Sequence, residues 1–357
     1  MSDAPKPGAL HTRICDLFGC KYPIVQTGMG WVSGSKLTAA TSEAGGMGIL
    51  ASATMTYAEL ESEIAAVKSL TDKNFGVNFR ADQDDIDKRI DLAIAQKVKV
   101  ASFAQAPREK IIKKLKDAGL VVMPTIGAKR HAEKVAAWGV DAVIAQGHEG
   151  GGHTGQVPTS LLLPQVCDTV DIPVLGAGGF NDGRGLIAAL SYGASGIAMG
   201  TRFLLTQESA VPDAIKAQYI KTPVTGTVVT KAIDGYPQRV IRTDVVEQLE
   251  RSSIITRLFR ALGYAFALRK HTETSFGALI QEGLAMRENQ NLSWSQLAMA
   301  ANAPMLTKAS MVDGNLDVGI LPTGQVVGVI EELPTVEALV QRVMQEAQNT
   351  LDKLSAQ

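Results

Sequence analysis

The ten residues from 146 to 155 read QGHEGGGHTG and hold the densest set of chemically useful side chains in the chain. His148 and His153 are five residues apart across three glycines, whereas a helical zinc motif places its two histidines four apart on one helix face. We therefore expect no metal site. A histidine on a glycine loop suits general base catalysis, because an unperturbed imidazole has a pKa of about 6.5. His153 is the predicted catalytic base, and His148 and Glu149 are expected to shape the loop.

Two glycine turns offer main-chain N–H groups to an anion. The first, 177–180, reads AGGF and the second, 199–202, reads MGTR, and each follows a short apolar run. A single glycine pair is most often only a turn, but two such turns on the last two strands of a barrel match its usual phosphate site. Neither GxGxxG opening a helix after a strand nor GxxxxGK[ST] occurs, which argues against a dinucleotide fingerprint or a Walker site.

Eight short apolar runs predict the scaffold that positions these residues. They recur at intervals of roughly 21 to 32 residues and begin at Ile24, Met47, Phe75, Val98, Val121, Ala142, Val174 and Gly196. Helix-like stretches separate them: Leu60, Ile64, Val67 and Leu70 share one face of 57–70, and Pro107 marks the expected first position of a later helix. Eight strand–helix units favour an α/β fold with a closed (β/α)8 TIM barrel. An open doubly wound sheet is the alternative.

The pattern changes after Thr206, which predicts an insertion before the barrel is complete. We expect a barrel over 11–220 and 318–357, with a mainly helical lobe at 221–317 covering the active-site mouth. An apolar stripe of Ile254, Leu258, Leu262 and Phe266 is surrounded by cations at Arg251, Arg257, Arg260, Arg269 and Lys270. These cations form either a solvated helix face or contacts to the phosphates of a CoA thioester. A terminal helix over 335–354 would bury Leu339, Val343 and Ala347.

Composition narrows the range of partners. Lys and Arg total 35 against 36 for Asp and Glu, so no long-range field attracts nucleic acid or an anionic membrane. An odd count of three cysteines, Cys15, Cys20 and Cys167, indicates a reducing compartment. Residues 1–10 do not resemble a signal peptide, and glycines and Arg202 interrupt the most apolar window, 186–205. We expect a cytoplasmic protein that acts on small molecules. The sequence leaves the oligomeric state open, with a homodimer as one of the states considered.

Residues that directly follow the predicted strands are the candidates for the site, because barrel active sites lie at that end. They are polar but mostly uncharged, with no lysine for a Schiff base and no acidic cluster for magnesium. Amide groups and main-chain donors there suit a large heteroaromatic cofactor. The candidates are Gln26, Thr27, Gly28, Met29, Asn78, Thr125, Gln146, Gly178, Gly179, Gly200 and Thr201.

Five segments, PIVQTGMGWV, FGVNF, QGHEGGGHTG, AGGFNDGRG and AMGTRFLLT, together resemble the nitronate monooxygenase (2-nitropropane dioxygenase) family over nearly the whole chain. The resemblance implies FMN at the barrel mouth, and His153 matches the family histidine. A late glycine–glutamine pair would bring the C-terminal segment back to the flavin. The cofactor-binding residues so expected are Thr27, Gly28, Met29, Asn78, Thr125, Gln146, Gly152, Ala177, Gly178, Gly179, Gly200, Thr201 and Gln325.

Three further stretches, TVVTKAIDGYPQRVIRT, LSWSQLAMAANAPM and MVDGN, look like a subgroup linked to bacterial steroid C/D-ring degradation. That likeness implies a flavin-dependent dehydrogenase of hydroxylated bicyclic CoA thioesters. Within the family the histidine removes a proton while the flavin accepts a hydride or an electron, and a nitronate with O2 would instead give a carbonyl compound and nitrite. The loop reads EGGGH where relatives often have EAGGH or ECAGH, and Thr125 replaces a lysine of some relatives. An NAD(P)H:quinone reductase and a non-redox phosphometabolite isomerase or synthase are the alternatives.

Overall fold

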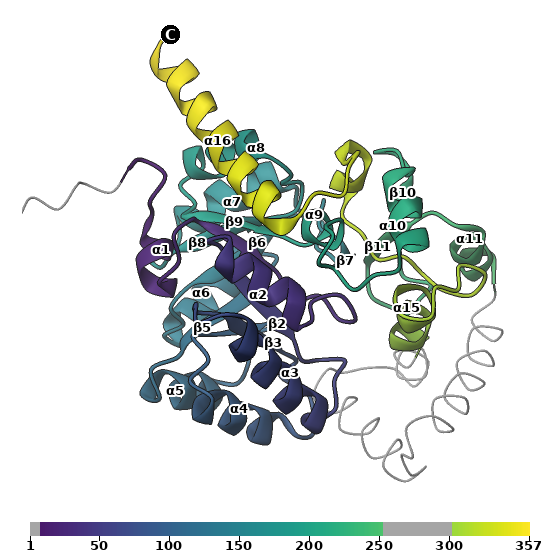
Figure 1. The fold of residues 1–357 in the computed structure, drawn as a ribbon, viewed down its shortest axis with the longest axis horizontal. Helices are drawn as coiled ribbons and strands as arrows, with labels where there is room; N and C mark the ends of the chain where they lie inside the picture. The colour runs from purple at the N-terminus through teal and green to yellow at the C-terminus, as the bar shows by residue number, and fades with distance from the viewer. Residues whose placement is uncertain (1–7, 253–301) are drawn as a thin grey trace, which may run out of the picture.

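A closed barrel of eight parallel strands forms the centre of the molecule (Figure 1). The computed structural model describes residues 8–252 and 302–357. Each barrel strand begins within two residues of its predicted start, which confirms the TIM barrel and rules out the open sheet. In barrel order the strands are β1 Ile24–Gln26, β2 Met47–Ala51, β3 Gly76–Phe79, β4 Val100–Phe103, β5 Val121–Ile126, β6 Val143–Gln146, β8 Val174–Ala177 and β9 Gly196–Met199.

Pairing of the first and last strands closes the barrel, with Val25 of β1 opposite Ala198 of β9. Helix α1 (Arg13–Phe18) buries Ile14 and Phe18 in the same apolar cluster as inward residues of the strands, so α1 covers one end of the barrel. The opposite end stays available for a site. The outer helices are α2 Ser35–Glu43, α3 Tyr57–Leu70, α4 Ile86–Ala95, α5 Glu109–Asp117, α6 Lys129–Ala137, α7 Thr159–Cys167 and α8 Gly183–Ser191.

Helix α3 shows how well the sequence pattern predicts which helix residues are buried. Its predicted inner face is correct for Leu60, Ile64 and Val67, which are fully buried. Leu70 was wrongly placed on that face: it ends the helix beyond the packed surface and is 52% exposed. The prediction for Pro107 was also wrong, because α5 begins at Glu109 after an extended N-cap and the proline lies outside the helix.

The C-terminal helix α16 (Val336–Ser355) is confirmed. The Thr335 side chain caps it by accepting a hydrogen bond from the Ala338 N–H at 3.2 Å. Leu339, Val343 and Ala347 are fully buried, and α16 packs against α8 and α2 (Figure 1). The twenty residues of α16 therefore complete the outer layer that surrounds the barrel.

The segment after β9 contains short helices and a small sheet. Strand β10 (Thr227–Thr230) pairs with β11 (Gln238–Ile241), and β11 also pairs with β7 (Gly152–His153), which lies in the loop after β6. The expected lobe is thus partly β-structure where it is described, and its predicted stripe at 254–266 with the cations at 257–270 lies outside the described residues. Its boundaries stay a prediction. The remaining elements are α9 Thr201–Leu204, α10 Asp213–Ile220, α11 Asp244–Arg251, α15 Asn302–Met311 and the 3-10 helix η1 Gln325–Val329.

Among the helices in the described ranges, none has the length and apolar composition needed to cross a bilayer. Arg251 of α11, one of the cations considered for a CoA contact, has an 81% exposed side chain and pairs with Glu247 at 3.2 Å.

Candidate active site

The ends of the barrel strands surround a cavity of about 440 Å³. Cofactor and substrate sites commonly have volumes of about 300–1,000 Å³. Gln26, expected at the mouth, is instead fully buried and donates to Ser33 Oγ at 2.9 Å. The predicted site residues that line the cavity are Thr27, Gly28, Met29, Asn78, Thr125, Gln146, Gly152, His153, Ala177, Gly178, Gly179, Gly200 and Thr201.

The structure places Gln325 beside the cavity, and its side chain is not part of the lining. The neighbouring residues Gly324 and Val326 do line it. The Gln325 N–H donates to the Glu149 carbonyl oxygen at 2.9 Å, and the Gly324 N–H donates to Thr201 Oγ1 at 2.8 Å. The C-terminal segment therefore returns to the mouth, held by the glycine loop and by the first residue of α9.

Two consecutive glycines after β8 form a cradle for an anion. Gly178 and Gly179 have φ values of +95° and +83°, which non-glycine residues adopt only at a cost. Within the described chain their main-chain N–H groups donate to no other residue. Gly200 approaches closely from β9, since a Cβ there would lie 3.2 Å from Thr27 Oγ1. These free donors and this open backbone fit the phosphate of a bound cofactor.

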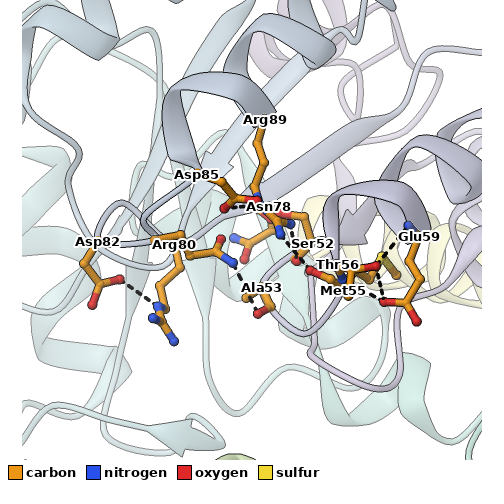
Figure 2. A network of polar contacts seen from close by, with 11 residues as sticks. Ser52, Ala53, Met55, Thr56, Glu59, Asn78, Arg80, Asp82, Asp85 and Arg89 are labelled. Carbon is orange, nitrogen blue, oxygen red and sulfur yellow. Dashed lines mark hydrogen bonds and ion pairs between the residues drawn. The ribbon is translucent and has the colours of Figure 1, made fainter. Parts of the chain in front are cut away.

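Asn78 is held in position by a polar network behind the ends of β2 and β3 (Figure 2). Its carbonyl oxygen accepts from Ser52 Oγ at 2.7 Å, and its side-chain amide donates to Ser102 Oγ at 3.3 Å. The Arg89 guanidinium, 4% exposed, reaches down from α4 and donates to the carbonyl oxygens of Ser52 and Met55. This buried cation ties the loop after β2 to α4, and the Ser52–Asn78 hydrogen bond ties the same loop to the end of β3.

The glycine loop after β6 is fastened from three sides. Glu149 Oε2 accepts from the Thr159 N–H and hydroxyl at 2.9 and 2.7 Å, and His148 Nδ1 lies 2.8 Å from the Gly155 carbonyl oxygen. These contacts agree with the shaping role expected of both residues. Gly151 lies against the C-terminal segment so closely that a Cβ would come within 2.4 Å of the Thr323 backbone.

A buried arginine supports the same loop from below. Arg239 Nη2 donates to the His148 carbonyl oxygen at 3.1 Å, and Nη1 donates to Thr227 Oγ1 at 2.9 Å. Burial lowers the pKa of Arg239, and the nearby Glu149 carboxylate partly opposes that shift. Arg239 lies opposite Gly152 in the β7–β11 ladder, so β11 supports the loop through the main chain as well.

His153 stands at the rim of the cavity with a 63% exposed side chain. Its carbonyl oxygen accepts from Gln146 Nε2 at 2.7 Å, and its ring Nε2 lies 2.7 Å from Asp234 Oδ2. Asp234 was not expected from the sequence, nor was Gln238, whose side chain lies beside the same ring nitrogen. No local pattern marks either residue, because they follow His153 by more than eighty positions and reach it only through the β7–β11 pairing.

An apolar wall completes the cavity and was not anticipated residue by residue. Trp31 lies in the loop between β1 and α2, and Leu204 belongs to α9. Pro304 and Met311 come from α15, which therefore covers part of the mouth. A polar floor of strand ends beneath an apolar wall is the usual composition of a cofactor and substrate site.

Comparison with known proteins identifies the family and agrees with the fold. The profile of the family described as "Nitronate monooxygenase" matches residues 11–92 and 85–346. The chain belongs to the nitronate monooxygenase family. The solved "Structure of FabK from Thermotoga maritima" superposes with a TM-score of 0.79 and is 33% identical, with 97% of this chain and 98% of that chain covered.

Two curated relatives in this family are similar over almost the full length. Both are named "(3aS,4S,5R,7aS)-5-hydroxy-7a-methyl-1-oxo-octahydro-1H-indene-4-carboxyl-CoA dehydrogenase". The protein of Rhodococcus jostii (strain RHA1) is 55% identical, covering 97% of this chain and 98% of the relative. That of Mycobacterium tuberculosis (strain ATCC 25618 / H37Rv) is 53% identical, covering 97% and 99%.

Membership of the nitronate monooxygenase family makes this protein a flavin-dependent oxidoreductase that acts on small molecules. The non-redox isomerase or synthase alternative is thereby set aside. The residues at the mouth fit a flavin, since the free N–H groups of Gly178 and Gly179 suit its phosphate and the amides of Asn78 and Gln146 suit the edge of a heteroaromatic ring.

Proposed function

We propose that this protein oxidises the ring hydroxyl of a bicyclic carboxyl-CoA thioester to a ketone, with FMN as cofactor and His153 as catalytic base. Identity of 55% and 53% to two dehydrogenases of such a compound, over 97% of this chain, supports the substrate class. The observation that carries the chemistry is an imidazole at the cavity rim whose Nε2 is bound to a buried carboxylate.

We infer that FMN is bound by the strand ends described above. Gly178, Gly179, Gly200 and Thr201 would hold the phosphate through their main-chain N–H groups. Asn78, Thr125 and Gln146 would bind the polar edge of the ring, and Thr27, Gly28, Met29, Gly152 and Ala177 would contact its faces and side. Gln325 would contribute by fixing Gly324 at the mouth rather than by a side-chain contact. When bound, FMN supplies the acceptor for the hydride that leaves the carbinol carbon.

His153 has the role of taking the proton of the hydroxyl group. As the O–H bond breaks, the proton moves to the free ring nitrogen of His153, and the electron pair left on oxygen forms the C=O bond while the carbinol hydrogen departs as hydride. The alcohol thus loses two electrons and two hydrogens. One hydrogen leaves as the proton that His153 takes, and the other leaves as hydride together with the two electrons. The cavity must hold the hydroxyl near the imidazole, for which the loop contacts of Glu149 and Arg239 supply rigidity.

The apolar wall supports a substrate whose fused hydrocarbon rings are the part bound in the cavity. Trp31, Leu204 and Met311 offer hydrophobic surface with no charged group, and burial of apolar area contributes roughly 25 cal/mol per Å². The CoA portion would extend outward past α15. A nitronate or a quinone is smaller or flatter and uses less of this wall.

Anaerobic mixing of the FMN-loaded enzyme with three compounds tests the proposal. We expect the 5-hydroxy-7a-methyl-1-oxo-octahydroindene-4-carboxyl-CoA to bleach the flavin absorbance faster than NADH or propionate 3-nitronate does. Bleaching by NADH alone would identify a quinone reductase, and bleaching by the nitronate alone would identify a nitronate monooxygenase activity. Either result would overturn the proposed substrate. A preparation that carries another flavin in place of FMN would overturn the cofactor assignment.

A further inference from the structure

Asp234 is a buried carboxylate just outside the cavity, with a side chain only 7% exposed. The Tyr236 N–H donates to its Oδ1 at 3.0 Å, and the Gln238 side-chain amide donates to its Oδ2. The third donor is Nε2 of His153, at 2.7 Å from Oδ2. In the described ranges His153 is also its one ion-pair partner. Because an unpaired buried charge is costly, the carboxylate and the imidazole depend on each other.

The contact decides which ring nitrogen of His153 carries hydrogen. An ionised carboxylate can only accept, so Nε2 must be the N–H that faces Asp234. Gln238 Nε2 lies 3.1 Å from the same ring nitrogen, but it too is a donor and is satisfied by Asp234. Nδ1 is then left with a free lone pair. The catalytic proton must therefore be taken at Nδ1.

The surroundings of His153 restrict the orientation of its ring as well as the position of its proton. Its main chain is paired with Gln238 across the β7–β11 ladder, which sets the direction of its Cβ. The Tyr236 ring packs edge-on against the imidazole, with centroids 6.1 Å apart and planes at 76°. Burial, with help from the Asp234 and Asp82 carboxylates, raises the pKa of the Tyr236 phenol, so this neighbour stays uncharged at neutral pH.

From this geometry we infer that Asp234 is a positioning residue that holds His153 as the Nε2–H tautomer and stabilises the imidazolium formed when Nδ1 takes the substrate proton. The inference rests on the proposed function, in which His153 is the base. Asp234 does not touch the cavity, and it acts through the imidazole alone. The arrangement has the same logic as a carboxylate that orients a catalytic histidine in hydrolases.

A double-mutant cycle separates this role from a merely structural one. Asp234→Asn is expected to lower kcat about 10- to 100-fold, the usual scale for a partner that orients a functional histidine, while KM stays nearly constant. Asp234→Glu keeps a carboxylate and should recover part of the loss. In a His153→Ala background, Asp234→Asn should cause no further loss. An equal loss in both backgrounds would mean that Asp234 only supports the fold, and the inference would be wrong.

Nitrogen NMR of the FMN-loaded wild-type protein, labelled with ¹⁵N-histidine, gives a test that needs neither turnover nor an Asp234 variant. We expect the His153 signals, assigned by their loss in His153→Ala, to show hydrogen on Nε2. His148 is an internal control with the opposite pattern, because its Nδ1 faces the Gly155 carbonyl oxygen and must be the donor. Hydrogen on Nδ1 of His153 would overturn the inference. If the tautomer is as expected but the thioester is not oxidised, the proposed substrate fails and the positioning role stands.

Discussion

His153 of β7 lies directly opposite Gln238 of β11 in an antiparallel ladder. This pairing joins the loop after the sixth barrel strand to a segment 85 residues further along the chain. The barrel alone therefore does not position His153, because the segment after β9 supplies the paired backbone of β11 and the Asp234 carboxylate that contact it. This segment and the barrel strand ends line the same cavity.

Replacing His153 by alanine should lower kcat by about 10²-fold or more, because the alcohol then has no base to accept its proton. FMN content should be unchanged, since the glycine turns after β8 and β9 are untouched. Steady-state turnover of the thioester measures the effect. His131→Ala is the matched control, because that histidine is exposed on α6, away from the cavity, and its loss should leave kcat as it was. A His153→Ala enzyme with normal kcat would refute the base assignment.

Replacing Gly179 by alanine should weaken FMN binding. The new Cβ would meet only ordinary contacts, 3.7 Å from the Glu149 Cβ, but it would project where the cofactor phosphate is expected. Gly119→Ala is a close control, because its φ of +82° matches the +83° of Gly179 and its Cβ would meet nothing within 4 Å. Both changes carry a conformational cost of roughly 1–2 kcal/mol.

Denaturant unfolding of the flavin-free proteins measures that shared cost, and the ratio of FMN to protein after gel filtration measures binding. We expect similar losses of stability but a low FMN ratio only for Gly179→Ala. Equal FMN ratios in the two variants would show that the turn after β8 does not hold the phosphate.

The helix after this turn gives a prediction about pH. Asp182 caps α8 by accepting from the N–H groups of Arg184 and Gly185 at 3.0 and 3.2 Å. Burial works to raise the pKa of Asp182, but the Arg184 guanidinium and the main-chain donors outweigh it, so the pKa lies below the ordinary 3.8. A lowered carboxyl pKa adds stability above the unfolded-state pKa, and this stability disappears as the pH falls through the folded-state value.

Asp182→Ala should therefore cost about 1 kcal/mol at pH 7, the usual value of an N-cap. Asp182→Asn keeps a capping oxygen without the charge and should cost less. The free energy of unfolding, measured between pH 7 and pH 2, should show the gap between wild type and Asp182→Asn closing on the acid side. A gap that widens on acidification would contradict the sign of the shift.

Much of this fold could be predicted because its signals are local. Each barrel strand is a short, mainly apolar run, and for every strand but β4 the next residue is glycine or polar. The glycine turns at Gly178 and Gly200 follow two of these runs directly. Since parallel strands end at the same rim of a barrel, the position of a residue after its strand is enough to place it at the mouth. That is why nearly all of the expected cofactor-binding residues line one cavity.

The partners of His153 could not be predicted in this way. Asp234 and Gln238 reach it through a two-residue strand in a glycine loop, and neither apolar alternation nor a turn signal marks such a strand. Leu70 shows a different limit of prediction from sequence. Its spacing fits the apolar face of α3, but it lies beyond the part of that face that is packed and is exposed. Periodicity predicts which face of an element is apolar, whereas tertiary packing decides where that face is covered.

Trp31 gives a prediction about substrate recognition. It lines the cavity, its backbone lies in the left-handed region with φ of +65°, and its main-chain N–H donates to Thr54 Oγ1 at 3.2 Å. That conformation costs roughly 1–2 kcal/mol for a side chain other than glycine. A costly conformation retained at a cavity wall points to a function for the indole. We expect the indole to pack against the fused rings of the substrate.

Trp31→Gly removes the indole and also its conformational cost, so stability should change little while KM for the bicyclic thioester rises about 10-fold, equivalent to roughly 1.4 kcal/mol of lost apolar contact. Lys97→Gly is the matched control: Lys97 is the other non-glycine residue with positive φ in the described ranges, at +54°, and it is exposed far from the cavity lining. It should leave KM unchanged. Thermal unfolding and initial-rate kinetics on both variants measure the two effects, and an unchanged KM in Trp31→Gly would mean that the rings bind elsewhere.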